Sequence, residues 1–412
     1  MLHPDIQTDP SRRDAGPALD EAVALAAALP GIDVVGAEVV NLRKPQPGTL
    51  LGKGKLQDIK AMVNAAEVDL VLVDGPVTPV QQRNLEQEWK VKLLDRTGLI
   101  LEIFADRAAT REGVLQVELA ALSYQRTRLV RAWTHLERQR GGLGFVGGPG
   151  ETQIEADRRA IDDAINRIRR QLSKVTKTRA LHRAARAKVP FPVVALVGYT
   201  NAGKSTLFNH MTGANVMAKD MLFATLDPTM RSIELDHGEK VILSDTVGFI
   251  SSLPTELVAA FRATLEEVLE ADLIVHVRDI ASPETKNQAV DVETILESLG
   301  VSEDVPRLEL WNKVDLLNDE AADALRNLAS RREDTLVISA TSGEGLTELH
   351  GAISAHLADV HTVETLTLPF SEGRKRAWLF EQGVVENETQ SEDGWALTLR
   401  WSSRQKADYA QV

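Results

Sequence analysis

The 412-residue chain contains no cysteine, which excludes disulfide bonds, thiolate metal sites and cysteine nucleophiles. It also lacks a long hydrophobic run. The apolar segment 22–29 is too short to span a bilayer and has no basic segment before it, so we predict a short core-facing helix and not a signal peptide. The nine histidines show no ligand spacing and no Gly-x-Ser-x-Gly elbow occurs, so a metalloenzyme or triad hydrolase is not indicated. We expect a cytoplasmic protein.

The net charge of −13 argues against a protein that coats nucleic acid through bulk electrostatics. The charge is unevenly distributed, because residues 126–188 hold sixteen Lys and Arg against six Asp and Glu. This segment is therefore a basic arm with an excess of ten positive charges, and the rest of the chain carries −23. Such an arm would bind a polyphosphate partner with an affinity that falls steeply with salt. The alternative is a solvated helical face that serves solubility.

A phosphate-binding loop is predicted at Gly198-Tyr-Thr-Asn-Ala-Gly-Lys-Ser205, which fits G-x-x-x-x-G-K-[ST]. In such a loop, backbone N–H groups surround phosphate oxygens, and the N-terminus of the following helix adds positive potential. Lys204 would then reach the β- and γ-phosphates. By itself the pattern indicates a nucleoside triphosphate and does not choose the base.

The base is predicted from Asn312-Lys-Val-Asp315. A carboxylate at Asp315 can accept hydrogen bonds from N1–H and the 2-amino group of guanine, whereas adenine offers neither donor at that edge. The aliphatic stem of Lys313 would lie over the base, and Asn312 would tie the segment to the phosphate loop. The Ala340 N–H would contact guanine O6. Apolar runs that precede these loops are typical of buried parallel strands, at 193–197, 240–244, 273–277, 308–311 and 335–338.

Phosphoryl transfer needs positioning and charge neutralisation. We expect the Ser205 and Thr225 hydroxyls to bind Mg²⁺, with Asp245 holding the ion through water, although Thr229 lies near Thr225 and is an alternative. The Gly248 N–H would contact the γ-phosphate. The predicted catalytic residues are Lys204, Thr225, Gly248 and Asn201. The predicted GTP/GDP-binding residues are Gly198, Tyr199, Thr200, Asn201, Ala202, Gly203, Lys204, Ser205, Thr206, Phe223, Ala224, Thr225, Asp245, Thr246, Val247, Gly248, Asn312, Lys313, Asp315, Ser339 and Ala340.

The order of expected elements predicts an α/β protein in five parts. Residues 1–20 are polar and are predicted to be a disordered tail, and 21–106 alternate between strand-like and helix-like runs, as in a small α/β domain. Few helix breakers occur in 107–140 and 151–188, so 107–188 is predicted to be a basic helical hairpin. A P-loop GTPase domain follows at 189–359, with a mostly parallel sheet and helices on both faces. A small α/β domain at 360–412 ends the chain.

The loop 141–150 contains six glycines, and we predict that it is not helical. It includes a literal G-x-G-x-x-G at 142–147, but a polar helix end and not a buried strand precedes it, so we reject a dinucleotide site. The segment 52–55 is rejected as a phosphate loop because it lacks the spacing and the Ser or Thr. The loop could be a flexible linker, or its backbone donors could grip RNA. The predicted RNA contacts are Arg138, Arg140, Gly142, Gly144, Gly147, Gly150 and Arg158.

Together these features resemble the HflX family of ribosome-associated GTPases over nearly the whole chain. The resemblance is carried by Asp95-Arg-Thr-Gly-Leu-Ile-Leu-Glu-Ile-Phe104, Leu115-Gln-Val-Glu-Leu119, Gly148-Pro-Gly-Glu-Thr-Gln153 and Phe223-Ala-Thr-Leu-Asp-Pro-Thr229. The chain departs from the family pattern at 145–148, where the family usually has a basic residue and one fewer glycine.

The resemblance implies a monomeric factor that binds the large (50S) ribosomal subunit in its GTP state through 107–188. The hairpin loop would enter the peptidyl-transferase region of 23S rRNA, stalled or idle 70S ribosomes would be split, and GTP hydrolysis would release the factor. Two alternatives remain open. A GTPase that assists tRNA modification fits the phosphate loop, but the related enzymes carry a carboxy-terminal cysteine that this chain lacks. A factor for ribosomal subunit assembly could use the nucleotide as a structural ligand.

The residue after Gly248 is Phe249, where many GTPases have a Gln that orients the attacking water. A phenyl ring can neither donate nor accept a hydrogen bond, so we predict slow hydrolysis by the protein alone and stimulation by the ribosome. Asn201 stands where some related switches use a P-loop Asn to help coordinate K⁺. We therefore predict stimulation by K⁺.

Overall fold

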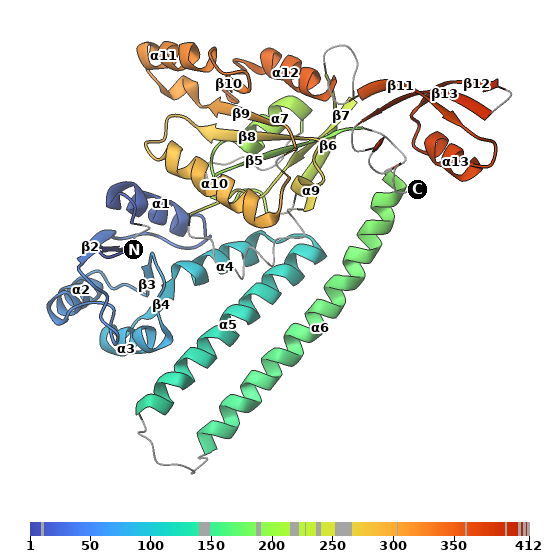
Figure 1. Ribbon diagram of the computed structural model, residues 1–412. Coiled ribbons are helices and arrows are strands. Elements are labelled where there is room, and N and C mark those ends of the chain that lie inside the picture. Colours follow the sequence, from blue (N-terminus) through green and yellow to red (C-terminus); the bar gives the residue numbers. More distant parts are fainter. Residues whose placement is uncertain are drawn as a thin grey trace.

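The computed structural model describes residues 1–9, 12–139, 149–186, 191–214, 222–226, 228–235, 240–251, 266–302, 304–358, 361–391, 394–402, 405–406 and 409 (Figure 1). Within these residues the strands form a four-stranded, a six-stranded and a three-stranded sheet. No helix of this part of the chain has both the length and the apolar character that crossing a membrane requires.

The amino-terminal domain is a parallel sheet in the order β2-β1-β3-β4. Its strands are β1 (Leu2–Ile6), β2 (Glu38–Leu42), β3 (Leu70–Val73) and β4 (Lys92–Asp95). Its helices are α1 (Ala15–Ala27), α2 (Lys53–Ala65) and α3 (Pro79–Trp89). The order is that of a doubly wound fold. α1 buries Ala22 and Leu25, as the apolar run at 22–29 predicted.

The prediction of a disordered tail at 1–20 is wrong. β1 lies between β2 and β3, so its backbone groups form hydrogen bonds on both sides, and Leu2 is buried. Asp14 caps α1, accepting a hydrogen bond from the Gly16 N–H at 3.3 Å. The strand was missed because the segment is polar in composition and five residues are too few to show the periodicity of a strand. The neighbouring strands, which are distant in sequence, decide its structure.

The helical hairpin follows a connecting helix, α4 (Arg96–Arg107). Its two helices are α5 (Arg111–Gln139) and α6 (Pro149–Arg186), which pack side by side and project from the rest of the molecule (Figure 1). Ile165 and Ile168 of α6 are buried. Gly150 is helical, contrary to the prediction for 141–150. Pro149 is favourable at the first position of a helix, and α6 starts there, two residues earlier than predicted.

The GTPase domain is the six-stranded sheet, in the order β10-β9-β8-β5-β7-β6. Its strands are β5 (Val193–Gly198), β6 (Thr229–Glu234), β7 (Lys240–Asp245), β8 (Leu273–Asp279), β9 (Arg307–Asn312) and β10 (Thr335–Val337). Its helices are α7 (Lys204–Thr212), α9 (Glu266–Leu269), α10 (Thr285–Leu299), α11 (Asp319–Ala329) and α12 (Leu346–Ala358), with a 3₁₀ turn η2 (Val314–Leu316). The predicted parallel strands are present. The antiparallel edge strand β6 was not predicted, because its half-exposed sequence has little apolar character.

The carboxy-terminal domain contains antiparallel strands in the order β11-β13-β12, with one helix beside them. These elements are β11 (His361–Leu368), α13 (Gly373–Glu381), β12 (Val385–Ser391) and β13 (Gly394–Ser402). β12 was not predicted.

The amino-terminal and GTPase domains share one hydrophobic core. Leu25 and Phe104 from the first domain belong to the same buried cluster as Val197 and Phe249 from the second. Helix α4 lies between them and buries its apolar face there. The predicted nucleotide-binding loops are therefore packed against the amino-terminal domain and not isolated from it.

Candidate nucleotide-binding site

The phosphate loop connects β5 to the start of α7, as the sequence predicted. Two glycines make its path possible. Gly203 has φ = 95°, a left-handed conformation that favours glycine, and a Cβ there would lie 2.2 Å from Asn312 Nδ2. At Gly198 a Cβ would lie 2.2 Å from the Val277 carbonyl oxygen. The loop thus needs glycine at both ends, on steric grounds.

Lys204 is buried at the first position of α7, and its ammonium donates hydrogen bonds to the carbonyl oxygens of Gly198 (3.0 Å) and Tyr199 (2.8 Å). Burial lowers its pKa to about 8, an effect that the nearby charge of Asp245 partly opposes. The ammonium is therefore held inside the loop with little solvation. A phosphate group that approached it would find a cation already in place.

Three predicted metal-binding side chains meet beside this lysine. Ser205 Oγ donates a hydrogen bond to Asp245 Oδ2 at 2.7 Å, and Thr225 Oγ1 donates to the same oxygen at 2.9 Å. The two hydroxyl oxygens lie 2.8 Å apart. Thr229, the alternative to Thr225, instead begins β6 and pairs with Asp245 through the strand register.

The donor set suits Mg²⁺, which prefers oxygen ligands and few carboxylates. Asp245 is fully buried, and among the described residues its Oδ1 has no hydrogen-bond partner. Burial raises the pKa of this carboxyl group, although Lys204 and the two hydroxyls oppose the shift. A buried carboxylate with an unpaired oxygen is stabilised by a cation, so these residues fit the predicted ion. The Thr200 hydroxyl in the loop is likewise buried and unpaired within the described part.

Gly248 lies against the phosphate loop. A Cβ there would come 2.8 Å from Thr200 Cγ2, 2.9 Å from Thr200 Cα and 3.1 Å from Lys204 Nζ. The next residue, Phe249, hydrogen-bonds to the loop through its backbone, accepting from the Thr200 N–H at 2.7 Å and donating to the Gly198 carbonyl at 3.1 Å. Its ring is buried in the shared core. The side chain at this position therefore points into the protein.

Asn312 joins the base-recognition segment to the phosphate loop, as the sequence predicted. Its Nδ2 donates to the Ala202 carbonyl at 2.8 Å, and its Oδ1 accepts from the Ala340 N–H at 2.9 Å. The N–H expected at guanine O6 is therefore bonded to Asn312. Lys313 adopts a left-handed backbone conformation with φ = 67°, and its ammonium pairs with Asp279 at 2.9 Å.

Asp315 is exposed on the η2 turn, at the carboxyl end of β9. Ser339, also a predicted contact, is buried, and its hydroxyl accepts from the Ser342 N–H at 3.1 Å to shape the following turn. The predicted contacts of both residues with guanine stay predictions.

Several other predicted nucleotide contacts have side chains that face the protein interior. The Thr246 hydroxyl donates to the Leu196 carbonyl at 2.6 Å, and Val247 is buried in the core. The Phe223 ring is buried, with its backbone at φ = 57°, and packs edge-on against Phe104 at 4.6 Å between ring centroids. These residues could contact a nucleotide through their backbones. Ala224 and Thr206 are half-buried, and Asn201 is exposed with φ = 58°.

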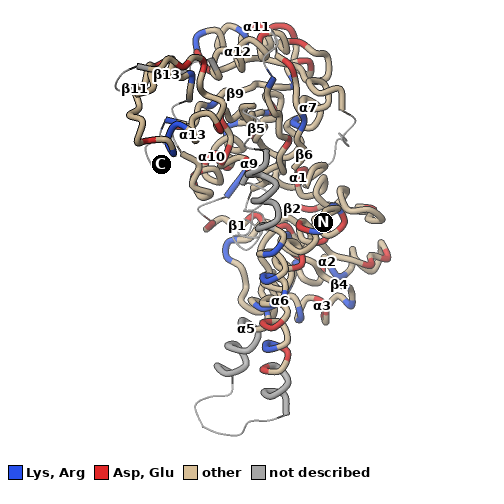
Figure 2. The backbone as a smooth tube through the Cα atoms, turned by 90° about the vertical axis from the view of Figure 1, so that its right-hand side faces the viewer, with Lys and Arg blue, Asp and Glu red and all other residues tan. Residues whose placement is uncertain are grey.

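The predicted RNA contacts fall mostly beyond the described residues. Arg140, Gly142, Gly144 and Gly147 lie outside them, and Arg138 and Gly150 belong to the ends of α5 and α6 that flank the loop. Arg158 is exposed on α6 and lies 4.0 Å from the carboxylate of Asp162. The Asp and Glu residues of α6 all lie between residues 151 and 163, and every charged residue from 167 to 186 is Lys or Arg. Charges of both signs are seen on the described part of the helix (Figure 2).

A phosphate loop after β5, a hydroxyl–carboxylate cluster at the end of β7 and an Asn-Lys-x-Asp turn after β9 define the protein as a P-loop GTPase. Four family models match the chain. They are described as GTP-binding GTPase N-terminal (17–105), GTP-binding GTPase Middle Region (107–186), 50S ribosome-binding GTPase (193–313) and HflX C-terminal domain (324–411).

Two curated relatives agree with these matches over most of the chain. A GTPase HflX from Magnetococcus marinus is 47% identical over 97% of this chain and 90% of the relative. GTPase HflX from Escherichia coli K12 is 44% identical over 88% of this chain and 85% of the relative. A solved GTP-binding protein from Sulfolobus solfataricus, in complex with GDP, is 24% identical, with a TM-score of 0.44 over 87% of this chain and 99% of that one. The chain belongs to the HflX family of GTPases and hydrolyses GTP.

Proposed function

We propose that this GTPase binds the large ribosomal subunit and dissociates stalled or idle 70S ribosomes, and that GTP hydrolysis releases it. The observation that carries the proposal is the projecting hairpin of α5 and α6, which holds an excess of Lys and Arg and extends away from the nucleotide site (Figures 1 and 2). The family model over 193–313, described as a 50S ribosome-binding GTPase, names the same partner. The hairpin loop would contact 23S rRNA near the peptidyl-transferase region.

The hydrolytic step follows from the positions of the loop residues. Lys204 would neutralise charge on the β- and γ-phosphates, and the Gly248 N–H would bind the γ-phosphate. Ser205 and Thr225 would hold Mg²⁺, with Asp245 behind them; when bound, this ion neutralises phosphate charge. Because the Phe249 ring is buried, that side chain does not orient the attacking water. We propose that hydrolysis is slow in the free protein and that the ribosome stimulates it.

We also propose a role for K⁺. Asn201 is exposed in the phosphate loop, where its amide oxygen could coordinate a monovalent cation close to the transferred phosphate. The cation would place positive charge beside the transferred phosphate, where the Phe249 side chain offers no polar group. GTP turnover should therefore be faster in K⁺ than in Na⁺. Equal turnover in the two ions, with and without ribosomes, would remove this part of the proposal.

Sucrose-gradient sedimentation of 70S ribosomes tests the function directly. The full-length protein is added with GTP, a non-hydrolysable GTP analogue or GDP. We expect subunit separation with GTP or the analogue and none with GDP. With the analogue, the protein should stay in the 50S fractions, because release requires hydrolysis. If the protein stays in the free fractions under every condition, the proposal is contradicted. We propose that the free protein is a monomer. The cytoplasm is the compartment that a ribosomal partner implies.

A further inference from the structure

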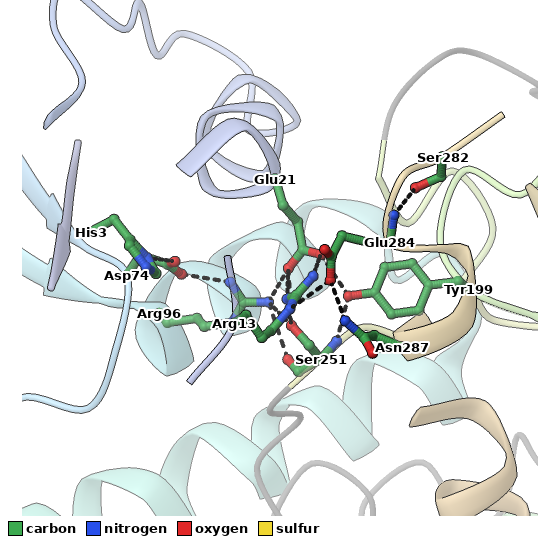
Figure 3. Close-up of polar contacts among 10 residues, drawn as sticks. All are labelled: His3, Arg13, Glu21, Asp74, Arg96, Tyr199, Ser251, Ser282, Glu284 and Asn287. Carbon is green, nitrogen blue, oxygen red and sulfur yellow. Dashed lines mark hydrogen bonds and ion pairs between the residues drawn. The ribbon is translucent and has the colours of Figure 1, made fainter. Parts of the chain in front are cut away.

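Ser251, three residues after Gly248, is bonded at every polar group, mostly to the amino-terminal domain (Figure 3). Its N–H donates to Tyr199 Oη at 2.8 Å, and its carbonyl oxygen accepts from Arg96 Nη2 at 3.1 Å. Its hydroxyl donates to Glu21 Oε1 at 3.0 Å and accepts from Arg96 Nη2 at 3.1 Å. The peptide that follows the predicted γ-phosphate contact is therefore held by residues from elements far apart in the sequence.

Arg96 is itself fixed by two carboxylates whose side chains are only 6% and 10% exposed. Its side chain is 9% exposed and forms ion pairs with Asp74 and Glu21 (Figure 3). Glu21 also accepts a hydrogen bond from the Tyr199 hydroxyl of the phosphate loop at 2.6 Å. Burial alone would raise the pKa of Glu21, but the charges of Arg96 and Arg13 hold it below its ordinary value, so Glu21 is ionised. Moving Arg96 away from Ser251 would leave charges buried without partners, which is costly.

The preceding residue, Asp95, contacts the hairpin. Its carboxylate caps α4 by accepting from the Gly98 N–H at 2.8 Å. The Tyr124 hydroxyl of α5 lies 2.6 Å from each of its oxygens, and Arg128 of α5 donates to it at 3.0 Å. Two neighbouring residues at the start of α4 thus contact different parts of the protein. Asp95 contacts the hairpin, and Arg96 contacts the peptide after Gly248.

We propose that the Asp95-Arg96 pair couples the hairpin to the nucleotide site, with Arg96 as a positioning residue for Ser251 and hence for Gly248. A γ-phosphate that draws Gly248 toward it shifts Ser251 and Arg96, and the first turn of α4 passes this shift to α5 through Asp95. Because coupling is reciprocal, a change at the hairpin end must alter nucleotide preference. The inference deepens the proposed function, since the hairpin is the proposed ribosome-binding element, but its test uses no ribosomes.

The first test changes Arg96 in the full-length protein and measures affinities for GDP and a non-hydrolysable GTP analogue by fluorescence titration. Arg96→Lys keeps a charge for Asp74 and Glu21 but loses the planar guanidinium that reaches Ser251. We expect the affinity for the GTP analogue to fall at least about fivefold while GDP affinity stays within about twofold. Equal losses for both nucleotides, or no change, would overturn the positioning role.

The second test changes the hairpin end and compares two arginines of α5 that lie two residues apart. Arg128→Met removes a contact with Asp95, whereas Arg126→Met removes a pair with Asp162 of α6 at 3.2 Å. Arg128→Met and Tyr124→Phe should shift the ratio of GTP-analogue to GDP affinity by about threefold or more, and Arg126→Met should leave it unchanged. If Arg128→Met and Arg126→Met give the same ratio of GTP-analogue to GDP affinity, the proposed coupling is wrong.

A double-mutant cycle between Arg96→Lys and Tyr124→Phe completes the design. Coupled residues give a combined effect that differs from the product of the single effects, whereas independent ones multiply. Multiplicative effects would overturn the proposed link. If Arg96→Lys does not fold, as judged by thermal unfolding, Ser251→Ala and Glu21→Gln replace it, because each removes part of the same contact while keeping the arginine. Failed ribosome splitting with intact coupling would reject the proposed function alone.

Discussion

At the scale of single residues, the nucleotide site depends on groups that have little room to change. Gly248 and Gly203 lie so close to neighbouring atoms that a methyl group would not fit. Lys204 and Asp245 are buried charges whose pKa values are shifted by their surroundings. These positions therefore give sharp predictions.

Gly248→Ala should lower single-turnover GTP hydrolysis by about 100-fold or more, because one preorganised donor is worth that much in comparable sites. The added Cβ would press on Thr200 Cα, which is backbone, so Gly248 must shift and carry its N–H away from the γ-phosphate. GDP has no γ-phosphate, and its affinity should change little. The control is Gly351→Ala on α12, where an added Cβ meets no described atom within 4 Å. Wild-type hydrolysis by Gly248→Ala would contradict the assignment.

Nucleotide affinity should depend on pH through Lys204. Its pKa is about 8 in the structure, and bound phosphates must raise it, so the complex holds more protons than the free protein above about pH 8. Affinity should therefore fall as the pH rises from about 7 to about 8.8, and calorimetry in buffers of different ionisation enthalpy should detect proton uptake on binding. Lys204→Gln should bind weakly and without this pH dependence. A pH-independent wild type would show that the lysine stays charged in the free protein.

At the scale of elements, α4 connects the nucleotide site to the hairpin of α5 and α6. α4 buries Leu99, Ile103 and Phe104 between two domains, and its first turn contacts both the hairpin and the peptide after Gly248. Phe223, two residues before the predicted metal ligand Thr225, packs on the last turn of α4 through Phe104. One helix thus touches both segments that should respond to the γ-phosphate.

Ile168→Ala in α6 should destabilise the hairpin by about 2–5 kcal/mol, because a buried apolar side chain is replaced by a cavity. Scanning calorimetry should show a lower first unfolding transition. Arg169→Ala, on the exposed face of the same helix, should leave it unchanged. Unchanged unfolding of Ile168→Ala would mean that packing of this side chain does not stabilise α6, because alanine itself favours a helix.

At the scale of the whole molecule, a basic hairpin extends from an acidic body. Under the proposed function, this separation would direct a polyanionic partner to the hairpin, and it predicts that binding of the large subunit is sensitive to salt. Among the described residues, α5 of the hairpin contacts α4, and α4 packs in the core that the two domains share. A partner bound at the hairpin could affect the nucleotide site through these contacts.

Affinity for isolated 50S subunits should fall at least about tenfold between 50 and 200 mM salt. Arg167→Gln with Arg170→Gln, both exposed on α6, should weaken binding and reduce the slope of log affinity against log salt. The control is Arg331→Gln with Arg332→Gln, which removes the same charge from the GTPase domain. Equal slopes for the two double variants would place the ribosomal contact elsewhere.

The sequence by itself was enough to predict the candidate nucleotide site, because the motifs that define it are local. A glycine that alone tolerates a left-handed φ or a close approach, a lysine at a fixed spacing and an Asn-Lys-x-Asp turn each act within a few residues, and the structure brings Ser205, Thr225 and Asp245 together as expected. Strands β5, β7, β8 and β9 were likewise predicted, since buried parallel strands are continuous apolar runs.

Only the tertiary structure decided that residues 2–6 form a central strand and that Asp95 and Arg96 join the hairpin to Ser251. The family-specific stretch 95–104 marked this region, but a charged pair ahead of an apolar run does not reveal its partners. Arg96 and Ser251 are 155 residues apart, and their contact exists because α4 packs into a core shared by two domains. Such contacts are set by the burial of apolar surface from distant segments, which no local pattern encodes.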